Sequence, residues 1–451
     1  MIKNFWSYFD IRSSRIGVLA LIVLICIVEA VVYRHESWLQ VFGLQESTLN
    51  NVQYAYANGY EYENDIDNAP LFAEAFELGR STYTLAGVNS NHESKLDMGS
   101  YSADAFRILL PFLASFLLPL LTLQDAYLVI NTLYWIFTSY AMLFLGEHIF
   151  NSKIVGVISA LLCATSYQFI ILATNPEAAL FQLSAVVILT ALSFYLDHFS
   201  NDDHWPALAN SLLLGGISGI LTFGSLGSGF FIPILLTYGI LSQRFSVFLK
   251  RNLAFGVGFL LIVVSILSFV DQGAPVTGGH LVNLLAGMDW GRWWLVYKDK
   301  MLNHFIYLIP VHFWLGALVG LILITRDQRK IILCMFTPLI FSEFLMLNVT
   351  SPYYNWTIGY FYLQVLFPIY LLNAKFIQSL ISPNSKIRGV KVFTRAVLTV
   401  FIFLTVFTSN LPLLGNYYYY HESRRHTPIQ VLVHSYFTLN NLYVYRGVIH
   451  K

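Results

Sequence analysis

Charge is what this sequence has least of. Only 11% of its 451 residues are charged, against roughly 25% in an ordinary soluble domain, while 56% are hydrophobic. This deficit excludes a soluble globular protein. The apolar residues recur in blocks of about 20, the length that an α-helix needs to cross a hydrocarbon core about 30 Å thick. Because lipid does not tolerate unpaired backbone groups, we expect an all-α polytopic membrane protein.

Cysteine is also scarce, and several common sites have no sequence support. Cys26, Cys163 and Cys334 all fall inside apolar runs, so we expect small core residues rather than a disulfide framework. The histidines are scattered, without the spacing of a zinc site. No glycine-rich phosphate loop follows a strand, so nothing predicts a bound nucleotide. We expect no nucleic-acid partner.

Eleven apolar segments are long enough to span a bilayer, and we expect eleven transmembrane helices. These segments are residues 16–33, 126–146, 154–174, 178–196, 207–223, 228–243, 252–270, 303–325, 331–348, 357–373 and 394–410. A further segment at 107–123, RILLPFLASFLLPLLTL, follows a polar loop and contains two prolines. It fits either a span or an interfacial helix.

The distribution of basic residues decides between these two alternatives. Lys and Arg in short loops strongly prefer the cytoplasmic side. If 107–123 lies at the interface, every dense basic cluster falls on one side of the membrane. The clustered residues are Lys3, Arg12, Arg15, Lys153, Arg244, Lys250, Arg251, Arg326, Arg329, Lys330, Lys375, Lys386, Arg388, Lys391 and Arg395. We therefore expect a cytoplasmic N-terminus and an extracytoplasmic C-terminus, in a plasma (inner) membrane.

This topology divides the chain into three parts. Residues 1–270 form a transmembrane module with a long first extracytoplasmic loop at 34–125, which carries interfacial helices. Residues 271–410 supply the distal helices and an outer loop at 271–302. Residues 411–451 form an extracytoplasmic tail.

The first outer loop is acidic where its sequence reads YENDIDNAPLFAEAFELGR, residues 62–80. Asp67 or Asn68 can cap a short amphipathic helix that ends at Gly79. A cap does not explain the other carboxylates beside it. Asp65 and Asp67 form a D-x-D pair, a spacing that can present two carboxylates to one divalent cation such as Mg or Mn. A solvated acidic loop with one N-cap remains the alternative.

The order of these features resembles the GT-C superfamily of integral-membrane glycosyltransferases, such as the O-mannosyltransferases and the aminoarabinose transferases. The similar pieces are DNAPLFAEAFELG in the first loop, YSADAFRILLPFLASFLLPLL at the interfacial segment, and ILATNPEAALFQLSAVVIL where the third span emerges. The resemblance covers about residues 1–270. It implies a hexosyl- or pentosyltransferase that takes its sugar from a polyprenyl-phosphate donor at the outer face of the bilayer.

The resemblance also implies roles for particular carboxylates. A base must take the proton of the acceptor hydroxyl while the sugar leaves the phosphate. Asp67 is the first candidate, and Asp65 is the second, either as base or as metal ligand. Glu177 takes the place of the family's second acid, although a first-turn acid can also serve the helix dipole alone. The acceptor class stays open among glycan, lipid and protein.

Arginine and aromatic residues of the outer segments complete the expected site. The leaving phosphate suits guanidinium groups, which bind its oxygens bidentately. The candidates are Arg107, Arg292, Arg424 and Arg425. The candidates for contact with the sugar or the acceptor are Tyr62, Trp290 and Trp293. Snorkelling of arginine and an aromatic belt at the membrane interface are the alternatives.

Three other functions remain open on the sequence. A transporter or lipid flippase predicts charges near the midplane and broken helices in two matching halves; here only Glu343 lies well inside an apolar span, and no repeat is visible. An O-antigen polymerase-type enzyme predicts basic outer loops, whereas residues 34–107 carry eleven acidic and four basic residues. A non-enzymatic subunit of a membrane complex is the third.

Overall fold

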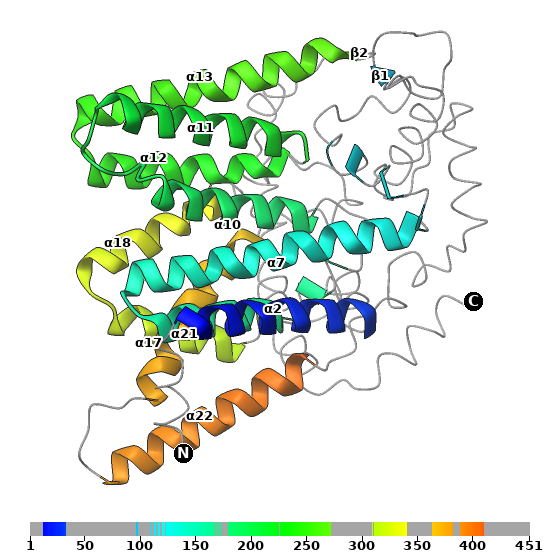
Figure 1. Ribbon diagram of the computed structural model, residues 1–451. Helices are drawn as coiled ribbons and strands as arrows, with labels where there is room; N and C mark the ends of the chain where they lie inside the picture. Colours follow the sequence, from blue (N-terminus) through cyan, green and yellow to red (C-terminus); the bar gives the residue numbers. More distant parts are fainter. Residues whose placement is uncertain are drawn as a thin grey trace, which may run out of the picture.

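The computed structural model describes fifteen stretches of the chain. They are residues 12–32, 96–97, 109, 112–113, 116–117, 120–121, 123–166, 169–170, 173, 179–224, 226–271, 309, 311–340, 363–381 and 388–409. In these stretches the protein is almost entirely helical (Figure 1). The only strands described are β1 (Leu96–Asp97) and β2 (Val270–Asp271), which pair in parallel.

Eleven α-helices are described, together with two short 3-10 helices. The α-helices are α2 (Arg12–Val32), α7 (Leu123–Phe150), α8 (Lys153–Ala164), α10 (Ala179–Tyr195), α11 (Trp205–Thr222), α12 (Phe231–Ser242), α13 (Phe245–Phe269), α17 (Val311–Leu323), α18 (Arg326–Met335), α21 (Leu366–Ile381) and α22 (Arg388–Ser409). The 3-10 helices are η5 (Leu226–Phe230) and η7 (Leu363–Val365). Each segment predicted to span the membrane overlaps one of the α-helices.

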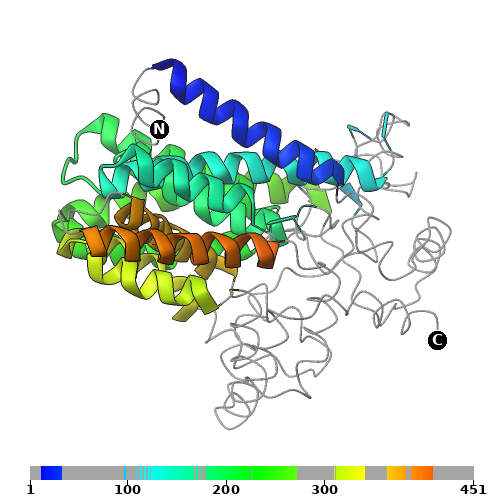
Figure 2. The same cartoon turned by 90° about the horizontal axis from the view of Figure 1, so that it is seen from below.

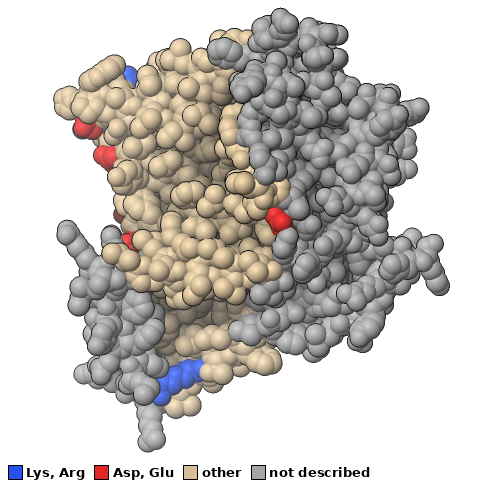
Figure 3. Space-filling view, turned by 45° about the vertical axis from the view of Figure 1, so that its right-hand side comes forward, with Lys and Arg blue, Asp and Glu red and all other residues tan. Residues whose placement is uncertain are grey.

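Three of the described helices are long and apolar enough to cross a membrane. The apolar parts that could cross it are Asp125–Phe150 of α7 with 26 residues, Trp205–Thr222 of α11 with 18 residues, and Phe245–Ser268 of α13 with 24 residues. The outward-facing surface of the described bundle is almost free of Lys, Arg, Asp and Glu in the view of Figure 3. The all-helical fold and the membrane character expected from the composition are therefore shown.

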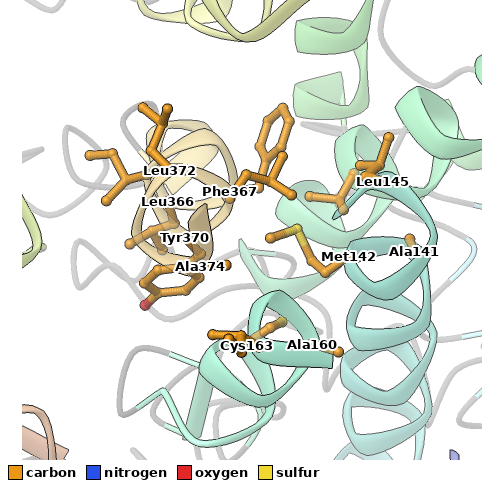
Figure 4. Close-up of a cluster of buried hydrophobic side chains, with 14 of the residues drawn as sticks. Ala141, Met142, Leu145, Ala160, Cys163, Leu366, Phe367, Tyr370, Leu372 and Ala374 are labelled. Carbon is orange, nitrogen blue, oxygen red and sulfur yellow. The ribbon is translucent and has the colours of Figure 1, made fainter. Parts of the chain in front are cut away.

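One large apolar core joins the helices from both halves of the chain. It includes Ile22 from α2, Trp135 from α7, Leu183 from α10 and Phe401 from α22. Figure 4 shows its centre, where side chains of α7, α8 and α21 converge. The three cysteines are buried and free, as expected of small core residues. Helices from the start and the end of the chain thus share one core, whereas α11 and α13 pack in a separate cluster with Leu214 and Phe255.

Glycine allows two of the helices to approach closely. A Cβ on Gly215 of α11 would overlap the carbonyl oxygen of Phe255, and one on Gly258 of α13 would overlap the carbonyl oxygen of Leu212. Small residues at such contacts are typical of helix pairs in membranes, where van der Waals packing replaces the hydrophobic effect. The backbones of α11 and α13 are therefore in direct van der Waals contact at these two glycines.

The connections from α7 to α8, α10 to α11, α12 to α13 and α17 to α18 lie at one end of the bundle, at the left in Figure 1, which we call the junction end. Gln328 donates its side-chain amide to the carbonyl of Ile149 at 3.0 Å, and Gln378 donates to the hydroxyl of Ser152 at 2.8 Å. These bonds bring the turn between α7 and α8 beside the start of α18 and the end of α21. The other end is called the opposite end; α8 and α11 end there, and α7, α10 and α21 begin there.

Helix boundaries differ from the predicted spans where local chemistry sets them. The structure starts α18 at Arg326, five residues before the predicted span 331–348. Thr325 caps this helix: its side chain accepts from the backbone of Gln328, whose side chain accepts from the backbone of Thr325 in return. This capping box begins the helix in a polar sequence that hydropathy alone assigns to a loop.

Candidate functional site

Buried, uncharged polar side chains gather toward the opposite end, and we call them the polar layer. They come from α7, the segment after α8, α10, the end of α11, η5, η7 and α21. The members are Asn131, Ser166, Gln182, Thr222, Ser228, Gln364 and Tyr370. Burial of so many polar groups in an apolar bundle is costly unless hydrogen bonds compensate for it.

Hydrogen bonds link several members of the polar layer to each other or to the backbone. The hydroxyls of Ser166 and Tyr370 are 2.6 Å apart, which joins the segment after α8 to α21. Asn131 donates to the carbonyl of Ala173 at 3.4 Å. These contacts fix the chain where α8 ends and α21 begins.

Gln182 lies beside η5 because a glycine makes room for it. A Cβ on Gly227 would overlap the carboxamide of Gln182. Two hydroxyls near this contact, those of Thr222 and Ser228, are 3.2 Å apart. The start of α10 is thus packed against the turn that joins α11 to α12, with polar atoms between them.

Gln364 differs from the other members of the layer. It is only 1% exposed, and neither its Nε2 nor its Oε1 has a hydrogen-bond partner in the part of the chain that the structure describes. An unpaired buried amide costs about 1–3 kcal/mol for each group left unsatisfied. Its 3-10 helix η7 packs against α10, the helix that carries Gln182.

The described residues of the segment 107–123 also stay at the opposite end. The backbone N–H of Leu109 donates to the carbonyl of Phe223 at 2.8 Å, just after α11 ends. Leu109, Leu113, Leu117 and Leu121 all pack on a small core that includes Tyr127 near the start of α7. Because both ends of this segment contact the same end of the bundle, the interfacial alternative is favoured over a crossing.

At the junction end a buried arginine organises the loop of residues 196–204. Arg251 of α13 is fully buried. It donates to the carbonyl of Asp197 at 2.7 Å, to the carbonyl of Asp202 at 2.6 and 2.9 Å, and to the hydroxyl of Ser200 at 2.6 Å. Asp197 takes a positive φ of 54° in this loop. The guanidinium therefore holds the connection between α10 and α11 in one shape.

His198 lies in the same loop and is fully buried. Its Nδ1 is 2.9 Å from the hydroxyl of Ser211, and its carbonyl accepts from Gln243. Burial and the positive charge of Arg251 lower the pKa of His198 to about 3. The imidazole is therefore neutral near pH 7.

An exposed group of possible metal ligands occurs beside this loop. Asp202, Asp203 and His204 present their ligand atoms within 4.8 Å of one another. Lys250 already donates to Asp203 at 2.6 Å, and its charge lowers the pKa of that carboxyl. Asp202 accepts from the backbone of His204 at 3.0 Å. Both carboxylates thus serve local structure, and nothing else here indicates a metal ion.

The residues predicted from the sequence as site residues lie outside the described stretches. They are Tyr62, Asp65, Asp67, Arg107, Glu177, Trp290, Trp293, Arg292, Arg424 and Arg425. Glu343 also lies outside them. Their roles as base, metal ligand, phosphate donor or sugar contact stay predictions.

Two kinds of polar residue lie inside the bundle although the sequence did not predict a role for them. One is the neutral amide within an apolar run, as in ALFQLSAVV around Gln182 and YLQVLF around Gln364. The other is Glu29, an acid inside the first predicted span, whose Oε2 is buried and has no partner in the described part of the chain. The signal for both kinds is a single polar residue within an apolar run of the sequence.

No model of a protein family matches this chain, and no curated protein is significantly similar to it.

Proposed function

We propose that this protein is a membrane glycosyltransferase of the GT-C kind. It transfers one sugar from a polyprenyl-phosphate donor to a glycan, lipid or protein acceptor on the extracytoplasmic face of the plasma membrane. It crosses the bilayer eleven times, with the N-terminus inside and the C-terminus outside. The observation that carries this proposal is the polar layer at the opposite end of a bundle whose short basic connections lie at the junction end.

The charges of the junction end support this orientation. Lys153 starts α8, Lys250 lies near the start of α13, and Arg326, Arg329 and Lys330 lie on the first turns of α18. Short loops with Lys and Arg stay on the cytoplasmic side. The junction end is then cytoplasmic, and the polar layer faces the extracytoplasmic side, where a polyprenyl-linked sugar is presented.

Two of the predicted site residues lie close in the sequence to described residues at the opposite end. In the sequence, Glu177 comes two residues before α10, the helix of Gln182, and Arg107 comes two residues before Leu109. The described ends of both segments belong to the opposite end of the bundle. In the proposed site, the predicted outer loops supply the charged residues, and the helix ends supply the neutral polar residues.

The proposed reaction is a substitution at the anomeric carbon of the donor sugar. The bond from this carbon to the phosphate oxygen breaks, and a new bond forms to the oxygen of the acceptor hydroxyl. Asp67 accepts the hydroxyl proton, with Asp65 and Glu177 as the next candidates for this role. Arg107, Arg292, Arg424 and Arg425 are the candidates that bind the departing phosphate. A divalent cation held by Asp65 and Asp67 would serve the same purpose.

The distribution of buried charge favours a transferase over a transporter. A transporter is expected to bury charged residues near the midplane of the bilayer. In the described stretches Arg251 is the only charged side chain among the buried residues, and it lies at the junction end. The members of the polar layer are neutral, and Glu29 of α2 is the one acid in the described stretches with a buried, unpartnered carboxylate oxygen.

The test is sugar transfer by the purified protein. Radiolabelled polyprenyl-phosphate sugars are supplied to the wild type, to Asp67→Asn and to Asp65→Asn, with and without a chelator. We expect transfer by the wild type and its loss in Asp67→Asn, while the variant keeps its thermal unfolding temperature. Loss of transfer with chelator would make the Asp65 and Asp67 pair a metal site. Transfer from no donor would overturn the proposal.

A further inference from the structure

The side-chain amide of Gln364 is buried without a hydrogen-bond partner, and the described part of the chain does not explain why. Its side chain is 1% exposed, yet both its polar atoms lack partners in the described part of the chain. Other buried amides keep at least one bond. Gln243 donates to two carbonyls of the loop 196–204, and Asn373 donates to the carbonyls of Phe313 and Ile369. A buried amide without any bond is unusual in a folded protein and indicates a partner from outside the chain.

The position of this amide points to the same conclusion. Gln364 lies on η7, directly before α21, and η7 packs against α10. The helix α10 carries Gln182, whose carboxamide occupies space left free by Gly227. Two glutamine amides thus belong to adjoining elements at the opposite end, where α8 and α11 end.

The chemistry of an amide narrows the class of ligand. A carboxamide offers N–H donors and an acceptor oxygen but no charge. A phosphate offers only acceptors, so it would leave Oε1 of Gln364 unpaired. Neighbouring hydroxyls of a sugar ring both donate and accept, and they satisfy both atoms of the amide together. None of the members of the polar layer is charged, which also fits a neutral ligand.

We infer that Gln364, on an element that packs against the helix of Gln182, forms with it a neutral subsite that binds the hydroxyl groups of a sugar and so determines which sugar the protein accepts. This inference rests on the proposed function, because it deepens the same site. The phosphate of the donor is bound elsewhere, by cationic groups. The sugar is either that of the lipid-linked donor or that of a glycan acceptor, since the hydroxyl chemistry is shared.

The variant Gln364→Met keeps the length of the side chain and removes its polar atoms. Without ligand, we expect it to unfold at a higher temperature than the wild type, because the unpaired amide no longer has to be buried. With ligand, we expect about tenfold to hundredfold weaker binding, because the hydrogen bonds to the sugar are lost. The stability gain and the affinity loss together separate a ligand-binding amide from a structural one.

Gln378→Met is the matched control on α21. Its amide donates to Ser152 at 2.8 Å, and its oxygen accepts from Lys375 at 2.9 Å, so both atoms are already paired at the junction end. We expect this substitution to lower the unfolding temperature and to leave ligand binding unchanged. The two glutamines should therefore respond in opposite directions.

The probes are undecaprenyl-phosphate-linked glucose, galactose, mannose and arabinose, bare undecaprenyl phosphate, and free oligosaccharides of the same sugars. Binding is measured by the shift in unfolding temperature with increasing probe. A shift from a lipid-linked sugar that exceeds the shift from bare lipid, and that is lost in Gln364→Met, supports a donor subsite. A shift from free oligosaccharide that is lost in the same variant supports an acceptor subsite.

Two results would overturn the inference while leaving the proposed function intact. One is equal binding of a sugar probe by the wild type and Gln364→Met. The other is a lower unfolding temperature of unliganded Gln364→Met, which would make the amide structural. If no sugar probe shifts the wild type at all, the proposed function fails, and the sugar subsite fails with it.

Discussion

The two ends of the helical bundle bury polar groups in different ways. At the junction end each buried polar side chain described above makes at least one hydrogen bond to the protein, and Arg251 alone bonds to two carbonyls and one hydroxyl. At the opposite end Gln364 makes none in the described part of the chain. The junction end is thus complete by itself, whereas the opposite end holds polar atoms that remain available.

This contrast distinguishes polar groups that stabilise the fold from polar groups that are available to bind a ligand. A polar group whose partners are all within the chain stabilises one conformation of that chain. A buried polar group without such partners reduces stability, and proteins keep such costs mainly at functional sites. We therefore place fold specification at the junction end and ligand recognition at the opposite end.

The largest expected effect concerns the sides of the membrane that the two ends face. Asp203→Cys at the junction end and Leu120→Cys at the opposite end each provide one exposed thiol, while the native cysteines are buried. In sealed right-side-out vesicles, a membrane-impermeant maleimide should label only Leu120→Cys, because the basic junction end is cytoplasmic. Permeabilised vesicles are the control and should allow both to react. The reverse pattern would contradict the proposed orientation.

The next largest effect is expected on stability at the junction end. Arg251→Leu removes the hydrogen-bond donor of the carbonyls of Asp197 and Asp202 and of the Ser200 hydroxyl, at a cost on the order of 3 kcal/mol. The unfolding temperature in detergent should fall strongly. Lys250→Ala, at the adjacent exposed pair, is the control and should change it little. An Arg251→Leu protein as stable as the wild type would show that the loop 196–204 does not depend on this arginine.

Substitutions at two glycines of η5 test whether the position of Gln182 at the opposite end matters for sugar transfer. A Cβ on Gly227 would overlap the flexible end of Gln182, whereas a Cβ on Gly229, in the same 3-10 helix, would meet no atom within 4 Å. Gly227→Ala should displace Gln182 and reduce sugar transfer on the order of tenfold to a hundredfold, with little loss of stability. Gly229→Ala should transfer at the wild-type rate. Equal transfer rates for both variants would show that Gln182 does not contribute to the sugar-binding site.

A smaller, pH-dependent effect is expected from His198. Its pKa is about 3 in the folded protein and about 6.5 in an unfolded chain. Between these values only the unfolded chain binds the proton, so stability falls as the pH falls below about 6.5, by up to about 1.4 kcal/mol per pH unit. His198→Asn should flatten the dependence of unfolding temperature on pH between 7 and 5. An unchanged pH dependence in His198→Asn would contradict this expectation.

The helices were largely predictable because the bilayer imposes a simple rule on the sequence. An apolar run of about 20 residues has few alternatives to a helix, and each predicted span overlaps a described helix. Boundaries were predicted less well where polar residues continue a helix. Capping by Thr325 extends α18 into a basic sequence, and the predicted span 357–373 ends before Lys375, which lies inside α21.

The polar layer was not predicted, because hydropathy averages over single amides. Gln182 and Gln364 each stand between apolar residues in the sequence, and the packing of η7 against α10, the helix of Gln182, is set by tertiary structure. The burial of Arg251 was also not visible in the sequence, where it is one of several basic residues of a short loop. Only tertiary packing distinguishes it from its exposed neighbour Lys250.

The most direct test of the account locates the sugar on the bundle. An undecaprenyl-phosphate sugar with a diazirine on the sugar ring is photo-crosslinked to the wild-type protein, and the modified peptides are mapped. We predict modification at the opposite end, in peptides from η5, the start of α10 and η7, and competition by unlabelled lipid-linked sugar. Modification confined to the loop 196–204 or to α18, at the junction end, would contradict the account.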